Sequence, residues 1–141
     1  MSKQKGFTLI ELVVVMVLLG ILAAYAVSRF YNFSTQANIA DINGLAGALN
    51  SANVTSHGAA IAVNQTGATG NITMEGQVVN MVYGYPNSAA GGINAAVIIS
   101  SAFTFAGGTP ATFTLQSNCL VTYTRATATS PSTITTTTSG C

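Results

Sequence analysis

Charged residues are scarce in this chain. Four Lys and Arg and three Asp and Glu make up 5% of its 141 residues, whereas ordinary soluble domains carry roughly 25%. The formal net charge is +1, and the four cations are scattered along the chain. A surface that follows nucleic-acid phosphates needs a clustered basic patch. We therefore expect no nucleic-acid partner.

The residues that carry most enzyme chemistry are almost absent. His57 is the only histidine, and the two cysteines, Cys119 and Cys141, do not form a Cys-x-x-Cys pattern. No nucleophile–base pattern and no phosphate-binding loop is present. The sequence therefore indicates no enzyme, no cofactor and no metal site, and His57 is expected to be a lone surface histidine.

One long apolar run stands near the N-terminus. Residues 7–27 contain a single charge, Glu11. About 20 apolar residues in a helix span the hydrocarbon core of a membrane. Lys3 and Lys5 precede the run and favour a cytoplasmic N-terminus with export of the rest. A secretory signal peptide, cleaved near residues 23–26, and a simple membrane anchor remain alternatives.

Glu11 is the informative residue of this run. An ionised carboxylate in an apolar helix costs a few kcal/mol unless it is paired, and such a residue is a functional-site candidate. The alternative is that Glu11 reaches back to the cytoplasmic interface. The Gly6–Phe7 junction four residues earlier favours a partner: the amine that cleavage would create on Phe7 of a neighbouring subunit.

The N-terminal string closely resembles that of type IV prepilins. The matching residues are Gly6, Phe7, Thr8, Leu9, Ile10 and Glu11. The resemblance implies that a prepilin peptidase removes the leader, residues 1–6, and methylates the Phe7 amine. It also implies that Glu11 sets the register between subunits.

Two further comparisons refine the resemblance. Many family members carry Pro where this chain has Ser28, so the family's helix bend at that position is in question. In the C-terminal part, residues 82–86, 92–93 and 119–124 look like the mannose-sensitive haemagglutinin (MSHA) subgroup of pilins.

The rest of the chain predicts an α+β fold: a long N-terminal helix, residues 7–56, packed on an antiparallel β head, residues 57–141. An apolar stripe around Ile42, Leu45 and Leu49 should face the head, and Gly44 and Gly47 could permit close packing. Gly58 is a plausible end of the helix. Residues 57–75 read as a surface loop, and residues 97–99 as either a strand or a helical turn. Strands are expected at residues 77–83, 102–106, 112–116 and 119–124.

The two cysteines are expected to form one disulfide, because export places them in an oxidising compartment. Two free buried thiols are the alternative. The bond between Cys119 and Cys141 would close the Thr- and Ser-rich segment 119–141 into a loop. In the family, the corresponding loop is the variable outer surface of the subunit.

The predicted function is that of a structural subunit of a type IV pilus, used for adhesion or motility. Its partners would be other copies of the chain, the prepilin peptidase and the assembly machinery of the inner membrane. The precursor would lie in the inner membrane and the product in an extracellular pilus on the bacterial surface. A type II secretion pseudopilin and a minor or tip pilin are the alternatives. Only Asp41 and Glu75 are acidic beyond the apolar run, which disfavours the calcium site typical of major pseudopilins.

Overall fold

The structure is a computed structural model that describes residues 7–141, apart from the side chains of residues 30–32. The predicted leader, with Gly6, Lys3 and Lys5, lies outside the described residues. The chain divides into two compact units, Met1–Gln36 and Ala37–Cys141.

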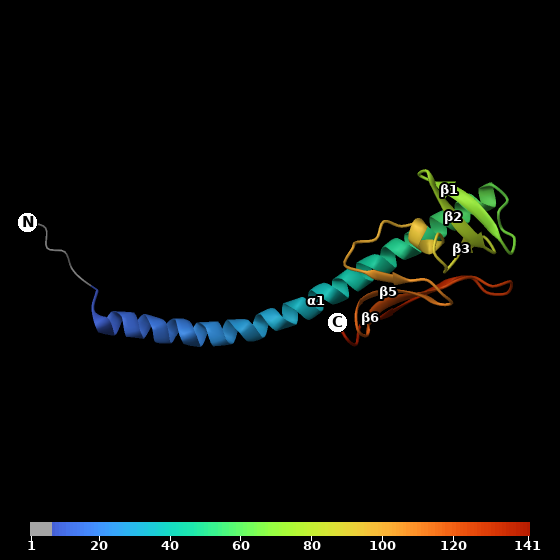
Figure 1. The fold of residues 1–141 in the computed structure, drawn as a ribbon. Helices are drawn as coiled ribbons and strands as arrows, with labels where there is room; N and C mark the ends of the chain where they lie inside the picture. The colour runs from blue at the N-terminus through green and yellow to red at the C-terminus, as the bar shows by residue number, and fades with distance from the viewer. Residues whose placement is uncertain (1–6) are drawn as a thin grey trace, which may run out of the picture. The chain divides into compact units, whose positions relative to one another are not determined.

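One helix, α1 (Leu9–Ala62), runs through both units (Figure 1). It is unbroken at Ser28 and at Gly58, so the end predicted at residue 56 is corrected to Ala62. A glycine lowers helix propensity by only about 1 kcal/mol, which tertiary packing overrides. Ala60 supplies that packing, since it is fully buried in the head.

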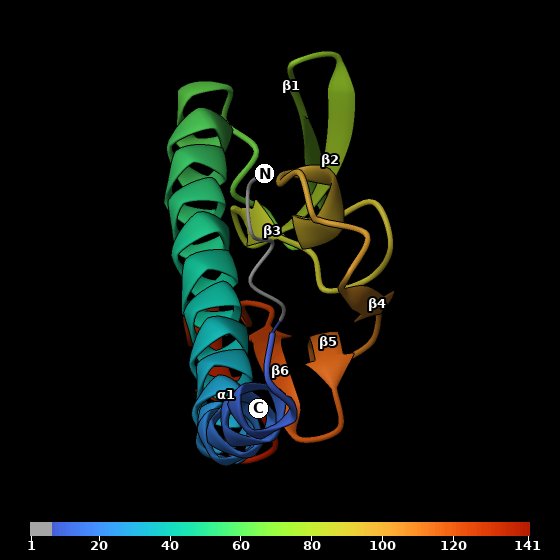
Figure 2. The same cartoon turned by 90° about the vertical axis from the view of Figure 1, so that its left-hand side faces the viewer.

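The head contains two antiparallel sheets. The first has the order β1–β2–β3 and the second the order β4–β5–β6–β7. Figure 2 shows them one after the other along the C-terminal half of α1. Their strands are β1 (Gly70–Met74), β2 (Gln77–Val82), β3 (Tyr85–Pro86), β4 (Thr104–Ala106), β5 (Ala111–Gln116), β6 (Cys119–Thr124) and β7 (Thr133–Thr137).

The four predicted strands correspond to β2, β4, β5 and β6, and the α+β fold class is confirmed. Three strands were missed. Strand β1 lies in the segment predicted as a loop, and β7 lies in the Thr-rich segment that was predicted as a closed loop. Residues 97–99 form neither a strand nor a helix, although a short 3₁₀ helix, η1 (Ile93–Ala95), precedes them.

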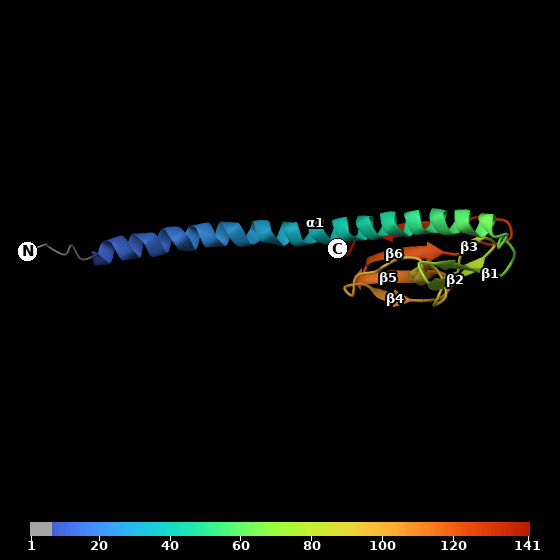
Figure 3. The ribbon, with the colours of Figure 1, turned by 90° about the horizontal axis from the view of Figure 1, so that it is seen from above.

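The predicted stripe of α1 faces the second sheet. Ile42 and Leu49 are fully buried there with Phe113, Val121 and Tyr123 of strands β5 and β6. Strand β6 contributes to this core through alternate residues. Cys119, Val121 and Tyr123 point inward, and the residues between them are less buried. In Figure 3, seen from above, this half of α1 lies along one side of the head and strands β4, β5 and β6 along the other.

A smaller core lies at the other end of the head. Ala60 of α1 packs with Ile72 of β1 and with Val79 and Met81 of β2. The role predicted for Gly44 and Gly47 is wrong, because a Cβ atom at either position would meet nothing within 4 Å. The helix therefore approaches the sheets through its larger apolar residues, not through these glycines.

Candidate assembly and stabilising sites

Thr8 and Glu11 cap the N-terminus of α1 reciprocally. The Thr8 backbone N–H and hydroxyl both donate to Glu11 Oε2, at 2.8 and 2.7 Å, and the Glu11 N–H donates to Thr8 Oγ1 at 3.4 Å. This Thr-x-x-Glu arrangement is a capping box, which satisfies two backbone donors of the first turn. The Thr-x-x-Glu signature is visible in the sequence at residues 8–11, but it was not among the predicted features.

The capping box leaves part of the Glu11 carboxylate unused. Glu11 Oε1 accepts no hydrogen bond from any residue that the structure describes. A carboxylate has two oxygens and about four acceptor positions. Glu11 therefore has a local structural role and, at the same time, free acceptor capacity for a donor on another molecule.

The apolar run is exposed all round the helix. This part of α1 is long and apolar enough to cross a membrane, and none of it is buried within the chain. An ordinary surface helix has one apolar stripe and a polar face, whereas a helix that is apolar all round is covered by protein or lipid. Its large exposed side chains are Leu9, Ile10, Leu12, Val13, Val14, Val15, Met16, Val17, Leu18, Leu19, Ile21, Leu22, Tyr25 and Val27.

The apolar run ends in a local cluster on α1. The Arg29 guanidinium donates to the Tyr25 hydroxyl at 2.9 Å and lies 5.3 Å from the centre of its ring. The Ser28 hydroxyl donates to the Tyr25 carbonyl at 2.9 Å. Serine can make this bond inside a helix, whereas proline at the same position would remove a backbone hydrogen bond. This explains why α1 continues through residue 28.

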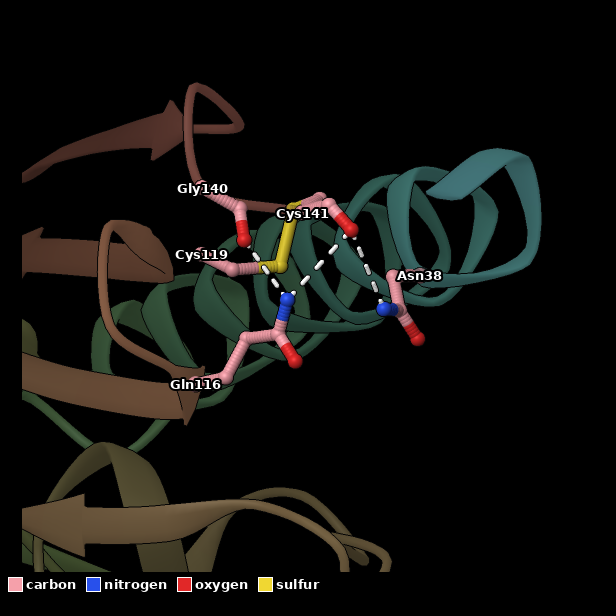
Figure 4. Close-up of a disulfide and its surroundings, with 5 residues drawn as sticks. All are labelled: Asn38, Gln116, Cys119, Gly140 and Cys141. Carbon is pink, nitrogen blue, oxygen red and sulfur yellow. Dashed lines mark hydrogen bonds between the residues drawn. A yellow bond between two sulfur atoms is a disulfide. The ribbon is translucent and has the colours of Figure 1, made fainter. Parts of the chain in front are cut away.

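Cys119 and Cys141 form the predicted disulfide (Figure 4). Hydrogen bonds hold the C-terminal residues on both sides of it. Gln116 Nε2 donates to the Gly140 carbonyl at 2.6 Å, and Asn38 Nδ2 donates to the Cys141 carbonyl at 3.2 Å. The disulfide and these amides thus connect β5, β6 and α1 at one end of the head.

A buried polar cluster lies where the two sheets meet α1. The Tyr123 hydroxyl is 2.6 Å from the Pro86 carbonyl oxygen and 3.2 Å from Asn53 Oδ1, and the Ser132 hydroxyl is 2.9 Å from the same Asn53 oxygen. Burial raises the pKa of Tyr123 to about 12. No local pattern in the sequence indicates the partners of Asn53.

His57 is not the lone surface histidine that the sequence predicted. It is half-buried, its ring stacks on Tyr85 with centroids 3.9 Å apart, and its Nδ1 lies 2.7 Å from the Gly84 carbonyl oxygen. A carbonyl only accepts hydrogen bonds, so Nδ1 carries the hydrogen. His57 therefore fastens the last turns of α1 to the turn between β2 and β3.

The structure keeps the predicted site residues in two separate groups. Phe7 and Glu11 belong to the first compact unit, where Phe7 is 81% exposed, and the cysteines belong to the second. The Gly6 side of the predicted cleavage site lies outside the described residues. No group of three or more His, Cys, Asp or Glu side chains that could hold a metal ion occurs within residues 7–141.

Comparison with known proteins gives one family match and several curated relatives. Residues 1–27 match the family described as the prokaryotic N-terminal methylation motif. The type IV narrow pilus major component PilA5 of Thermus thermophilus is 52% identical over 50 residues, which cover 36% of this chain and 43% of that protein. The type IV major fimbrial protein FimA of Dichelobacter nodosus is 44% identical over 41 residues, 29% of this chain and 26% of that protein. No solved structure matches the chain significantly.

The aligned stretches cover less than half the length of the curated relatives. The resemblance of the head to the MSHA subgroup stays a prediction. The match at residues 1–27 includes the predicted junction, the Thr8–Glu11 box and the exposed apolar run. The predicted resemblance to type IV pilins is thereby confirmed for the N-terminal segment of the chain.

Proposed function

We propose that the chain is a structural subunit of a type IV pilus. In this proposal the precursor is anchored in the inner membrane, cut between Gly6 and Phe7 and methylated on the new Phe7 amine. It then polymerises through its N-terminal helix into an extracellular fibre for adhesion or motility. Its partners are the prepilin peptidase, the assembly machinery of the inner membrane and other copies of itself.

The observation that carries this proposal is the exposed apolar surface of α1. A helix that is apolar on every side needs a membrane or other protein around it. A subunit that leaves the membrane must replace lipid with equally apolar contacts. Identical helices from other copies supply such contacts, and the polar head that follows residue 36 can remain in water.

Glu11 supports the same proposal through its unused oxygen. Within the described residues Oε1 has no hydrogen-bond partner, although Oε2 is satisfied by Thr8. A protonated Phe7 amine on an adjacent copy is a strong donor to a carboxylate. An unpaired charge among apolar helices is costly, so this pairing would favour one register between subunits.

Intact mass of fibre protein tests the processing step. Sheared fibres should yield a chain that begins at Phe7 and carries one added methyl group. A chain beginning at Met1, or near Ala26, would contradict the proposal.

Glu11 variants test the assembly step. Glu11→Gln and Glu11→Ala should be exported and cleaved but form few fibres, because neither can pair with an amine through a charge. Asp41→Asn is the matched control, since it removes an exposed acid beyond the apolar run. Normal fibre numbers in both Glu11 variants would show that the charge is dispensable.

The abundance of the subunit in sheared fibres distinguishes a major pilin from a tip pilin and from a pseudopilin. A major pilin should be the most abundant protein of sheared surface fibres; the two relatives are named as a major pilus component and a major fimbrial protein. A tip pilin would be a trace component, and a pseudopilin would be absent from such fibres.

A further inference from the structure

An open groove of about 930 Å³ runs beside the turn between β1 and β2. Its walls come from α1, from the β1–β2 hairpin and from the segment after η1. They are mainly apolar and include Ala52, Met74, Val78, Val97 and Ile98, with Glu75 at the turn. Ile98 is 97% exposed and Val78 55% exposed, so large apolar side chains at the groove face solvent. We call this feature the Glu75 groove.

Glu75 occupies a position that the turn itself does not favour. Its φ is 50° and that of Gly76 is 80°, so both central residues of this two-residue hairpin turn are left-handed. Such turns prefer Asn-Gly or Asp-Gly. The Glu75 side chain is exposed and makes no hydrogen bond or ion pair with any residue that the structure describes. Local structure therefore does not account for a glutamate here.

A second hollow contains the one cation of the head. Arg125 is the only Lys or Arg beyond residue 29. It is half-buried, and its guanidinium has no hydrogen-bond or ion-pair partner within residues 7–141. Small and aromatic side chains surround it: Ala68, Thr69, Tyr83 and Ala126. We call this feature the Arg125 surface.

We infer that the Arg125 surface of one copy docks on the Glu75 groove of the next copy. This inference rests on the proposed function, since it names the head contact between neighbours in the fibre. A second copy fits because it carries the complementary charge and an apolar rim, in a chain that has only three charged residues beyond residue 29. An isolated exposed ion pair contributes little, but apolar walls that exclude water strengthen it.

The two surfaces share no residue, so one copy can offer both at the same time. A contact between two different patches is heterologous, and repeating it gives a ring or an open helical filament. A pilus needs the open form. The head contact, made by the second compact unit, can thus extend the fibre from copy to copy, as the proposed contact between N-terminal helices does.

Cysteine cross-linking in assembled fibres tests this contact. The only native cysteines are joined to each other, so an introduced thiol has no native thiol to react with. Fibres of the Glu75→Cys/Arg125→Cys chain should give a ladder of cross-linked subunits after mild oxidation. Each single variant should give none, because a heterologous contact never brings two equivalent positions together. Asp41→Cys/Arg125→Cys is the matched control and should stay monomeric.

Charge reversal keeps the test decisive if the cysteine pair weakens assembly. Glu75→Arg and Arg125→Glu should each lower the yield of sheared fibres several-fold, and the double reversal should restore it. The contact would be overturned if the cysteine pair formed fibres that gave no cross-linked ladder, or if the Asp41 control gave an equal ladder. It would also be overturned if the double charge reversal did not restore the fibre yield. Failure of the proposed function differs from these, because the unaltered chain would then form no fibres.

Discussion

The Tyr123 hydroxyl donates a hydrogen bond to the Pro86 carbonyl oxygen at 2.6 Å, so strand β6 of one sheet is joined to strand β3 of the other. The two sheets have no strand in common, and each packs its own apolar cluster on α1. With Asn53 of α1 beside the same hydroxyl, this bond connects all three parts of the head.

Tyr123→Phe should lower the free energy of unfolding of the head by about 1–3 kcal/mol. The substitution keeps the ring in the core but leaves a buried carbonyl oxygen without its donor. Denaturant unfolding of the full chain in detergent measures the change. Tyr83→Phe is the control, because the Tyr83 side chain is partly exposed and has no hydrogen-bond partner in the described part of the chain. Equal effects of the two substitutions would show that the Tyr123 hydroxyl contributes nothing specific.

The same tyrosine should make stability depend on alkaline pH. Burial raises the pKa of Tyr123 to about 12, whereas an unfolded tyrosine titrates near about 10. The folded state therefore favours the neutral form. Its contribution is complete below about pH 10 and is lost as pH rises through about 12, by about 2 kcal/mol. Unfolding measured between pH 8 and 12 should show this loss in the parent chain and a flatter profile in Tyr123→Phe.

Removing the disulfide should destabilise the head by about 3 kcal/mol. A bond that closes a loop of about 20 residues restricts the unfolded chain by that amount. The Cys119→Ser/Cys141→Ser chain should also lose hydrogen-exchange protection in β7 first, because β7 is an edge strand paired only with β6. Two reactive thiols per chain in denatured, unreduced fibre protein would contradict the disulfide itself.

Glu75→Asn should stabilise the head while weakening the fibre. Asparagine adopts the left-handed conformation more readily than glutamate, which is worth about 1 kcal/mol at a φ of 50°. The fibre would nevertheless lose a charge that we infer to pair with Arg125. Thermal unfolding and the yield of sheared fibres measure the two effects separately. Gly76→Ala is a control with the opposite effect on stability. A φ of 80° at this position strains any side chain, although an added Cβ atom would meet nothing within 4 Å.

The N-terminal half of the molecule could be read from its residues because its signals are local. The apolar run, the Gly6–Phe7 junction and the position of Glu11 are adjacent in sequence, and a helix requires no distant partner for its hydrogen bonds. Strand β6 was also predictable, since three alternate residues, Cys119, Val121 and Tyr123, are apolar and buried. Such repeated alternation identifies a strand without knowledge of what it packs against.

Only the tertiary structure decided the remaining features, because each depends on residues far away in sequence. Strand β7 contains one apolar residue, Ile134, among threonines, and becomes a strand only by pairing with β6. The burial of Asn53 requires Tyr123, 70 positions later, and His57 is held by the Gly84 carbonyl, 27 positions later. A lone polar residue in a sequence carries no sign of such a partner. Long-range packing therefore determined the division into two sheets and the roles of these side chains, whereas local pattern determined the helix and its Thr8–Glu11 cap.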